Sequence, residues 1–222
     1  MKHLTACSFA CLLAAAGVTS LSAATKYWDI NGATTGAGGA SPGGAWTGAS
    51  WSTDSAGATA TGSFASGDEA VFSAGTDATG AFTVSANATA GSISFEEGTV
   101  TISGTITLGD GDITIGSGAT LSTSSSLRIS ATAGSVLTIN GGKVESTNPS
   151  TAGSFVDVDQ TIVLNGGGTL SYTTASLLNI VQTTTTISGT GPMIKDGAGI
   201  LERLPELISE WRRGKRFCPV DP

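Results

Sequence analysis

Short alternating apolar bursts separated by turn residues are the feature that most constrains this chain. In residues 91–139, apolar side chains two positions apart recur, with Gly, Ser and Asp between the bursts. Period-two alternation buries one face of a strand and leaves the other face in water. The turns return about every six to twelve residues, which is typical of stacked strands rather than helices. The sequence therefore predicts an all-β fold. The pairs are Ile93/Phe95, Val100/Ile102, Ile106/Leu108, Ile113/Ile115 and Leu137/Ile139.

Similar bursts continue on both sides of this stretch, separated by Gly-rich corners such as Asn140-Gly141-Gly142 and residues 165–168. A burst, a corner and another burst give a coil of about twenty residues, as in β-solenoids. We therefore expect a parallel β-helix, in which stacked coils bury Ile, Val and Leu in ladders. A β-sandwich is the alternative. The expected strands are 82–85, 92–95, 99–103, 143–146, 155–158, 161–164, 169–172 and 184–188.

Composition supports a single folded domain with little charge. The chain has 222 residues, of which 39% are hydrophobic and only 12% charged. This length is enough for one sizeable core, while the charged fraction is about half of that in an ordinary soluble domain. Disordered chains usually carry more charge than this. The combination favours a stacked β-structure whose exposed face carries hydroxyl groups.

Charge and histidine content exclude several classes of function. A net charge of −7 argues against nucleic acid or an anionic membrane as partner. The single histidine, His3, lies in the segment that we expect to be removed. A chain without histidine has no Ser-His-Asp or Cys-His mechanism and no His-containing zinc site. We expect a protein that is not an enzyme and needs no cofactor.

Residues 1–24 have the form of a signal peptide. A polar start precedes an apolar stretch, residues 4–18, which is too short to span a membrane. Small residues at Ser22 and Ala24 then favour cleavage after Ala24. We expect export with no membrane span in the mature chain; a buried N-terminal helix is the alternative. Cleavage leaves Cys218 as a single thiol, which excludes an intramolecular disulfide.

Residues 25–72 differ from the rest because they hold three of the four tryptophans, separated by Gly- and Ala-rich spacers. Aromatic side chains spaced by turns suggest a cap over the open end of a β-stack, where strand edges must be covered. A surface on which sugar rings stack is the alternative. The three residues are Trp28, Trp46 and Trp51.

Two motifs resemble bacterial autotransporter-associated β-strand repeat proteins, which are also called passenger-associated transport repeat proteins. The first motif follows the signal peptide, and the second matches the repeat itself. The first consists of Trp28, Gly44-x-Trp46, Trp51 and Gly67-Asp68-x-Ala70-Val71-Phe72. The second runs over residues 187–201, with its pattern carried by Gly189, Gly191, Lys195, Gly197, Gly199 and Leu201.

This resemblance implies a right-handed β-helix passenger at a bacterial surface or in the outer envelope. In that family the repeats are thought to assist export and to serve as scaffold or adhesive stalk, and the motif contains no catalytic residue. An unidentified surface component or polysaccharide is the implied partner. The resulting organisation is a signal peptide (1–24), a Trp-rich cap (25–72) and β-helix coils ending in a partial repeat (73–201).

Residues 202–222 break the pattern. This tail holds five of the ten Lys and Arg residues, and Ile200 before it stands where the repeat has Thr. Apolar residues at helical spacing, from Leu204 to Trp211, suggest a capping helix as one interpretation. We favour a truncated or frame-shifted end.

Candidate chemistry is sparse. Asp157 and Asp159 share one face of an expected strand, and paired carboxylates serve polysaccharide cleavage in lyases and hydrolases. Few further charged groups are available to converge on them, so a solvated face is favoured. A Gly/Asp turn at residues 109–112 resembles calcium-binding β-rolls, but it occurs only once.

Thr-x-Thr pairs raise a third possibility, a β-solenoid that orders ice. The pairs Thr99/Thr101 and Thr105/Thr107 point away from the apolar face. Their spacing is shorter than one coil, whereas an ice-binding array repeats once per coil. Thr is also simply favoured at exposed strand positions, so ice binding is the lesser alternative.

Overall fold

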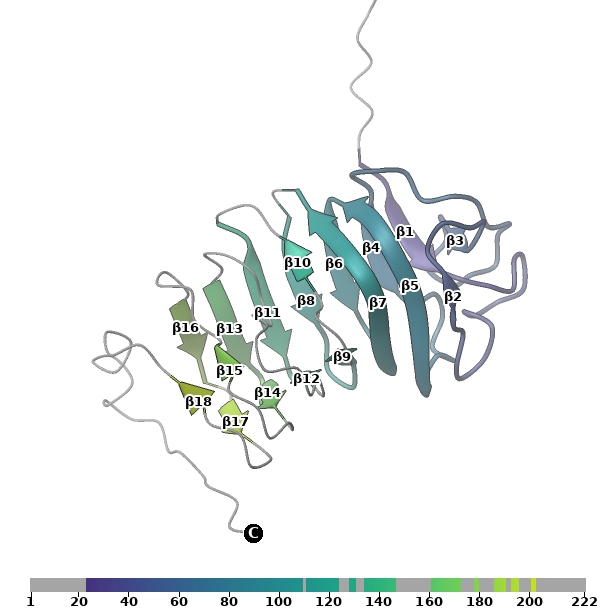
Figure 1. Ribbon diagram of the computed structural model, residues 1–222. Coiled ribbons are helices and arrows are strands. Elements are labelled where there is room, and N and C mark those ends of the chain that lie inside the picture. The colour runs from purple at the N-terminus through teal and green to yellow at the C-terminus, as the bar shows by residue number, and fades with distance from the viewer. Residues whose placement is uncertain are drawn as a thin grey trace, which may run out of the picture.

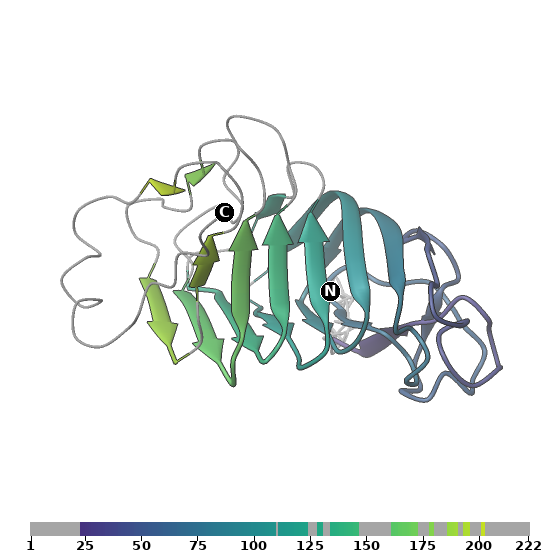
Figure 2. The ribbon, with the colours of Figure 1, turned by 90° about the horizontal axis from the view of Figure 1, so that it is seen from below.

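A computed structural model describes residues 23–109, 111–123, 128–130, 134–146, 161–172, 178–179, 186–190, 193–195 and 201–202. All regular structure within these residues is β-strand, as predicted, and the strands lie in two large sheets and one small one (Figure 1). Strands follow one another along the molecule in chain order, from the N-terminal strands at one end to the C-terminal ones at the other (Figure 2).

The first sheet is parallel apart from the pairing of its two N-terminal strands. Its strands, in spatial order, are β3 (Trp51–Ser52), β1 (Thr25–Trp28), β4 (Glu69–Phe72), β6 (Ser92–Phe95), β8 (Ile113–Ile115), β11 (Val136–Asn140), β13 (Thr161–Asn165) and β16 (Thr186–Gly189).

The second sheet is parallel throughout. It consists of β2 (Gly44–Ala45), β5 (Ala81–Ala90), β7 (Thr99–Leu108), β9 (Thr120–Thr123), β12 (Lys143–Ser146), β14 (Thr169–Tyr172) and β17 (Met193–Lys195), with β10 (Arg128–Ser130) also paired to β7. The small sheet pairs β15 (Leu178–Asn179) with β18 (Leu201–Glu202).

From β4 to β9, and again from β11 to β14, the chain alternates between the two large sheets, and strands that are neighbours within a sheet pair in parallel. Residues in register, such as Ile93, Ile113 and Leu137, are separated by 20 and 24 positions in the chain. This spacing agrees with the predicted coil of about twenty residues. Parallel pairing fits a β-helix and argues against the β-sandwich, whose neighbouring strands are antiparallel.

Inward-facing apolar ladders form the core between the sheets. Successive strands place an apolar side chain over the one before it, because the parallel pairing keeps their buried positions in register. Burying each such side chain is worth about 1.5–3 kcal/mol. Two of the ladders, whose members are at most 1% exposed, are Ile93–Ile113–Leu137–Ile162 and Phe72–Phe95–Ile115–Ile139–Leu164.

The two longest strands, β5 and β7, curve along their length (Figure 1). Midway along them Ala86 is paired with Gly104, which has a φ of +114°. A Cβ at Gly104 would collide with the carbonyl oxygen of Ala86, so glycine is required there. Beyond this point, residues 87–90 pair with residues 105–108 and extend the sheet.

Most expected strands are confirmed, with two differences of length. β5 and β7 run to Ala90 and Leu108, whereas the sequence predicted ends at residues 85 and 103. In β5 the inward positions beyond the predicted end hold alanines, which are too small to give an apolar signal. The predicted strand at 155–158 lies outside the described residues.

Candidate functional site

An aromatic cluster lies at the N-terminal end of both sheets. Its five rings have neighbouring centroids 4.7 to 5.8 Å apart, mostly in tilted or edge-to-face contact, which is the arrangement that aromatic quadrupoles favour. The rings belong to Trp28, Trp46, Trp51, Phe64 and Phe72.

The three tryptophans are buried, with exposed fractions of 0% for Trp28, 2% for Trp46 and 1% for Trp51. Sugar stacking requires an accessible ring face, so the alternative of a tryptophan platform is wrong for these residues. The sequence pattern showed that the aromatic residues cluster, but period and spacing contain no information on which face remains open.

The indole nitrogens of the cluster differ in their partners. Trp28 Nε1 donates to the carbonyl oxygen of Pro42 at 2.6 Å, and Trp51 Nε1 donates to that of Trp46 at 3.0 Å. The buried Nε1 of Trp46 has no hydrogen-bond acceptor. An unpaired buried donor costs about 1–3 kcal/mol.

The first family-like motif ends in a structural anchor. Asp68 is only 5% exposed, and its Oδ1 and Oδ2 accept hydrogen bonds from the backbone N–H groups of Ala24 (3.0 Å) and Ala65 (3.1 Å). Gly67 before it has a φ of +90°, and the following residues form β4. These contacts explain the Gly-Asp pair as a tie between the start of β1 and the turn before β4.

Asp77 holds the glycine-rich loop at residues 36–39. Its Oδ1 and Oδ2 accept hydrogen bonds from the backbone N–H groups of Ala37 and Gly39, both at 2.7 Å. Burial acts to raise the pKa of Asp77, but these and further backbone hydrogen bonds outweigh it and hold the pKa below its ordinary value. The carboxylate therefore fixes the backbone of this loop on both sides of Gly38, beside the buried Ala37.

Asp29 is the most deeply buried carboxyl group of this end, at 0% exposure. Burial raises the pKa of Asp29, hydrogen bonds from the N–H groups of Asn31 and Gly32 oppose the rise, and the charge of Asp77 adds to it. Its Oδ1 accepts from Asn31 at 2.9 Å, while Oδ2 has no partner. The ionised form of Asp29 therefore destabilises the folded state.

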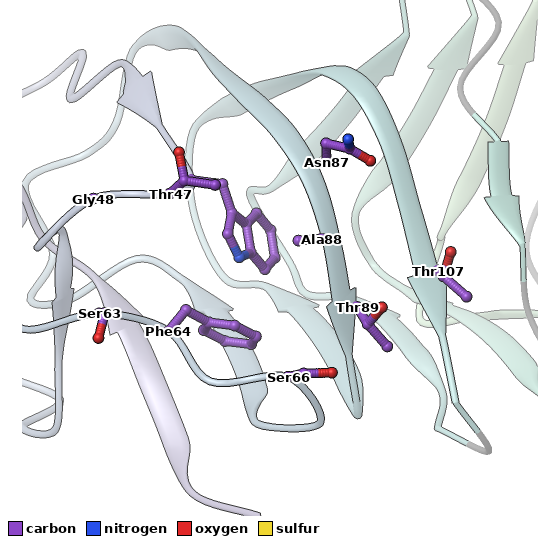
Figure 3. A pocket seen from close by; sticks show the side chains of 10 residues that line it. Thr47, Gly48, Ser63, Phe64, Ser66, Asn87, Ala88, Thr89 and Thr107 are labelled. Atoms are coloured by element: carbon purple, nitrogen blue, oxygen red, sulfur yellow. The ribbon is translucent and has the colours of Figure 1, made fainter.

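A pocket of ≈ 480 Å³ opens beside the aromatic cluster (Figure 3). One wall is the outer part of β5 and β7, and the other comes from the loops after β2 and before β4. Figure 3 shows the ring of Phe64 extending toward the β5 wall. The lining residues are Trp46, Thr47, Gly48, Ser63, Phe64, Ser66, Asn87, Ala88, Thr89 and Thr107.

The pocket combines aromatic, hydroxyl and amide groups without an ionisable side chain among its lining residues. Such a lining positions an uncharged ligand by hydrogen bonds, but offers no nucleophile–base pair and no charged group for acid–base catalysis. The sequence reading missed this site, because Asn87 and Thr89 alternate with alanines. That weak period-two pattern was the available signal.

A second hollow, ≈ 360 Å³, lies on the first sheet and includes Glu69 and Asp112. Both carboxylates are engaged: Glu69 accepts from the Thr25 hydroxyl at 2.8 Å, and Asp112 accepts from the N–H of Val136 at 2.8 Å. Asp112 therefore joins the Gly/Asp turn to β11. The part of the chain that the structure describes contains no group of three or more His, Cys, Asp or Glu side chains able to hold a metal ion.

The threonine columns are interrupted. Thr99 and Thr120 are in register on the second sheet, but the next position holds Lys143. Lys143 forms an ion pair with Glu145 at 2.9 Å, and Glu145 occupies the neighbouring column. A charged pair in this position does not continue the flat hydroxyl array on which the ice-binding alternative depends.

The predicted Asp157 and Asp159 lie outside the described residues, as do Gly191, Gly197 and Gly199 of the repeat-like motif. Gly189 ends β16 with a φ of +99°. Lys195 and Leu201 belong to β17 and β18.

Comparison of the chain with protein-family models, curated proteins and solved structures found no match. A search of the described residues for a helix long and apolar enough to cross a membrane also found none.

Proposed function

We propose that the chain is an exported, non-enzymatic, right-handed parallel β-helix that serves as a scaffold in surface display, adhesion or envelope structure. One observation carries the proposal. Apolar ladders run inward through successive parallel strands, while the outward positions hold mostly short hydroxyl side chains such as Ser94, Thr114 and Thr138. Quasi-one-dimensional stacking of this kind suits an elongated scaffold.

The aromatic cluster fits the role of an N-terminal cap. The terminal strands β2 and β3 have two residues each, which leaves only a short free edge for pairing with another chain. Beneath them, buried aromatic rings close the end of the core. A stack needs such an end because its last apolar rung would otherwise face water.

Export is tested with the full chain expressed in a Gram-negative bacterium. We expect mature protein outside the cytoplasm with a new N-terminus near residue 25, identified by N-terminal sequencing. Replacement of Leu12 and Leu13 by Arg should retain the unprocessed chain in the cytoplasm, because the apolar stretch is interrupted. Identical location and length of both proteins would contradict the export part of the proposal.

The non-enzymatic part is tested on a panel of neutral and acidic polysaccharides. We expect no depolymerisation by the purified mature chain, measured as release of reducing or unsaturated ends. Robust cleavage that disappears in Asp157→Asn would replace the scaffold proposal with a lyase or hydrolase.

A further inference from the structure

The pocket beside the aromatic cluster has no part in a purely structural scaffold. Its ≈ 480 Å³ lies within the range of about 300–1,000 Å³ that small-ligand sites occupy. Its walls come from segments distant in sequence: Phe64 belongs to the loop before β4, while Asn87 and Thr107 belong to β5 and β7 (Figure 3). The fold therefore assembles a concave site that the sequence alone does not show.

The lining restricts the chemistry of an occupant. An ion would find no opposite charge among the lining side chains, and burying an unpaired charge is unfavourable. An aliphatic ligand would remove water from Asn87, Thr89 and Thr107 without replacing the lost hydrogen bonds. An uncharged molecule with several hydroxyl groups and one apolar face satisfies both restrictions.

Phe64 provides an ordered apolar surface for such a molecule. Its ring centroid lies 4.9 Å from that of Trp46 and 4.7 Å from that of Trp51, and the side chain is only partly buried. Because neighbouring rings already fix its orientation, little conformational entropy remains to be lost when a ligand packs against it.

Trp46 lies beside the same pocket but is only 2% exposed, so the polar contacts must come from the strand wall. We propose that this pocket binds a neutral saccharide, with the sugar ring against Phe64 and sugar oxygens bonded to Asn87, Thr89 and Thr107. This names the ligand class for the adhesive part of the proposed function, and it rests on that function.

The test is ¹H–¹⁵N NMR of the mature chain titrated with glucose, galactose, mannose, N-acetylglucosamine, cellobiose and chitobiose. At least one of them should shift the indole N–H signal of Trp46 in a saturable manner. The indole signals of Trp28 and Trp51 are internal controls, because neither residue lines the pocket, whereas Trp46 does. Single Trp→Phe variants assign the three signals.

Substitutions in the β-strand wall test the location. Asn87→Ala and Thr107→Val should each weaken binding about three- to tenfold, which corresponds to the loss of one neutral hydrogen bond. Thr101→Val is the matched control: it lies on the same strand and the same outward face as Thr107 but does not line the pocket. It should leave the affinity unchanged.

Three results would overturn the inference. They are no saturable shift with any neutral saccharide, binding that Asn87→Ala and Thr107→Val leave intact, or preferential binding of glucuronate, glucosamine, phenol or hexanol. Export of the full chain is measured separately on cells. A chain that is exported but binds no saccharide refutes the inference alone, whereas a chain retained in the cytoplasm refutes the proposed function.

Discussion

The N-terminal region and the middle of the molecule are stabilised in different ways. In residues 92–145, repeated apolar side chains occupy equivalent positions on successive strands, and the rule is the same at each rung. In residues 25–80, irregular loops are held by contacts of different kinds. Aromatic rings pack against one another, and buried or half-buried carboxylates accept hydrogen bonds from backbone N–H groups. The periodic region thus depends on one repeated contact, whereas the N-terminal region depends on individual, non-repeating contacts.

The largest expected effect comes from removing a ring from the aromatic cluster. Trp51→Ala deletes contacts with four other rings and the hydrogen bond to Trp46, so it should lower the free energy of unfolding by about 3–5 kcal/mol. Denaturant unfolding of the mature chain measures this. Trp51→Phe, which keeps a ring, should lose clearly less. A loss below about 1 kcal/mol for Trp51→Ala would show that the cluster is not a cooperative part of the fold.

A smaller loss of unfolding free energy is expected from a substitution in the middle of the long strand β7. Gly104→Ala places a Cβ at a positive φ and against the Ala86 carbonyl oxygen, at a cost of about 1–3 kcal/mol. Gly109→Ala is the matched control, since a Cβ there meets no heavy atom within 4 Å. Equal stability of the two variants would contradict the close strand approach at Gly104.

The next effect concerns the carboxylate that holds the glycine-rich loop. Asp77→Asn places an amide NH₂ against backbone donors, so we expect a loss of about 1–2 kcal/mol at neutral pH for this partly solvated group. Because its pKa is lowered in the folded state, the Asp77 carboxylate stabilises the fold at pH values above the unfolded pKa of 3.8. This stabilisation is lost as the pH falls through the folded-state pKa. The variant should therefore show a flatter decline of stability in acid, measured by unfolding between about pH 2.5 and 7. Parallel pH profiles would refute this role.

Asp29→Asn should change the free energy of unfolding least of the four, and it should raise stability where the other substitutions lower it. Its raised pKa means that the folded state holds the proton more tightly, so stability falls as pH rises from 3.8 through the folded value. Asp29→Asn keeps an oxygen for the N–H of Asn31 and removes the buried charge. We expect a slight gain in the free energy of unfolding at pH 7 and no gain below about pH 3.5. Destabilisation at pH 7 would indicate that the charge itself is needed.

The same contrast explains how much the sequence could predict. The ladders were predictable because Ile93, Ile113 and Leu137 repeat a buried position at nearly constant spacing, and period-two alternation follows directly from strand geometry. Corner positions such as Gly141 were equally accessible, since Asn-Gly turns have a recognised backbone preference.

The aromatic region and the pocket were not predictable in the same way. That Trp46 is buried, and that Phe64 lies opposite β5, depends on loops whose paths have no periodic signal. The roles of Asp68 and Asp77 depend on contacts 44 and 40 residues away along the chain. Residue type identifies such carboxylates as candidates, but only the fold identifies their partners.

The central claim, parallel stacking in a fixed register, is tested most directly by site-directed cross-linking. With the three native cysteines replaced by serine, Ser94→Cys with Thr114→Cys places two thiols in register on adjacent strands, about 4.8 Å apart. Ser94→Cys with Thr138→Cys places them two strands apart. A short bifunctional thiol reagent should link the first pair efficiently and the second pair poorly, as read by mass spectrometry. Equal linking of both pairs, or linking of the second pair alone, would contradict the account.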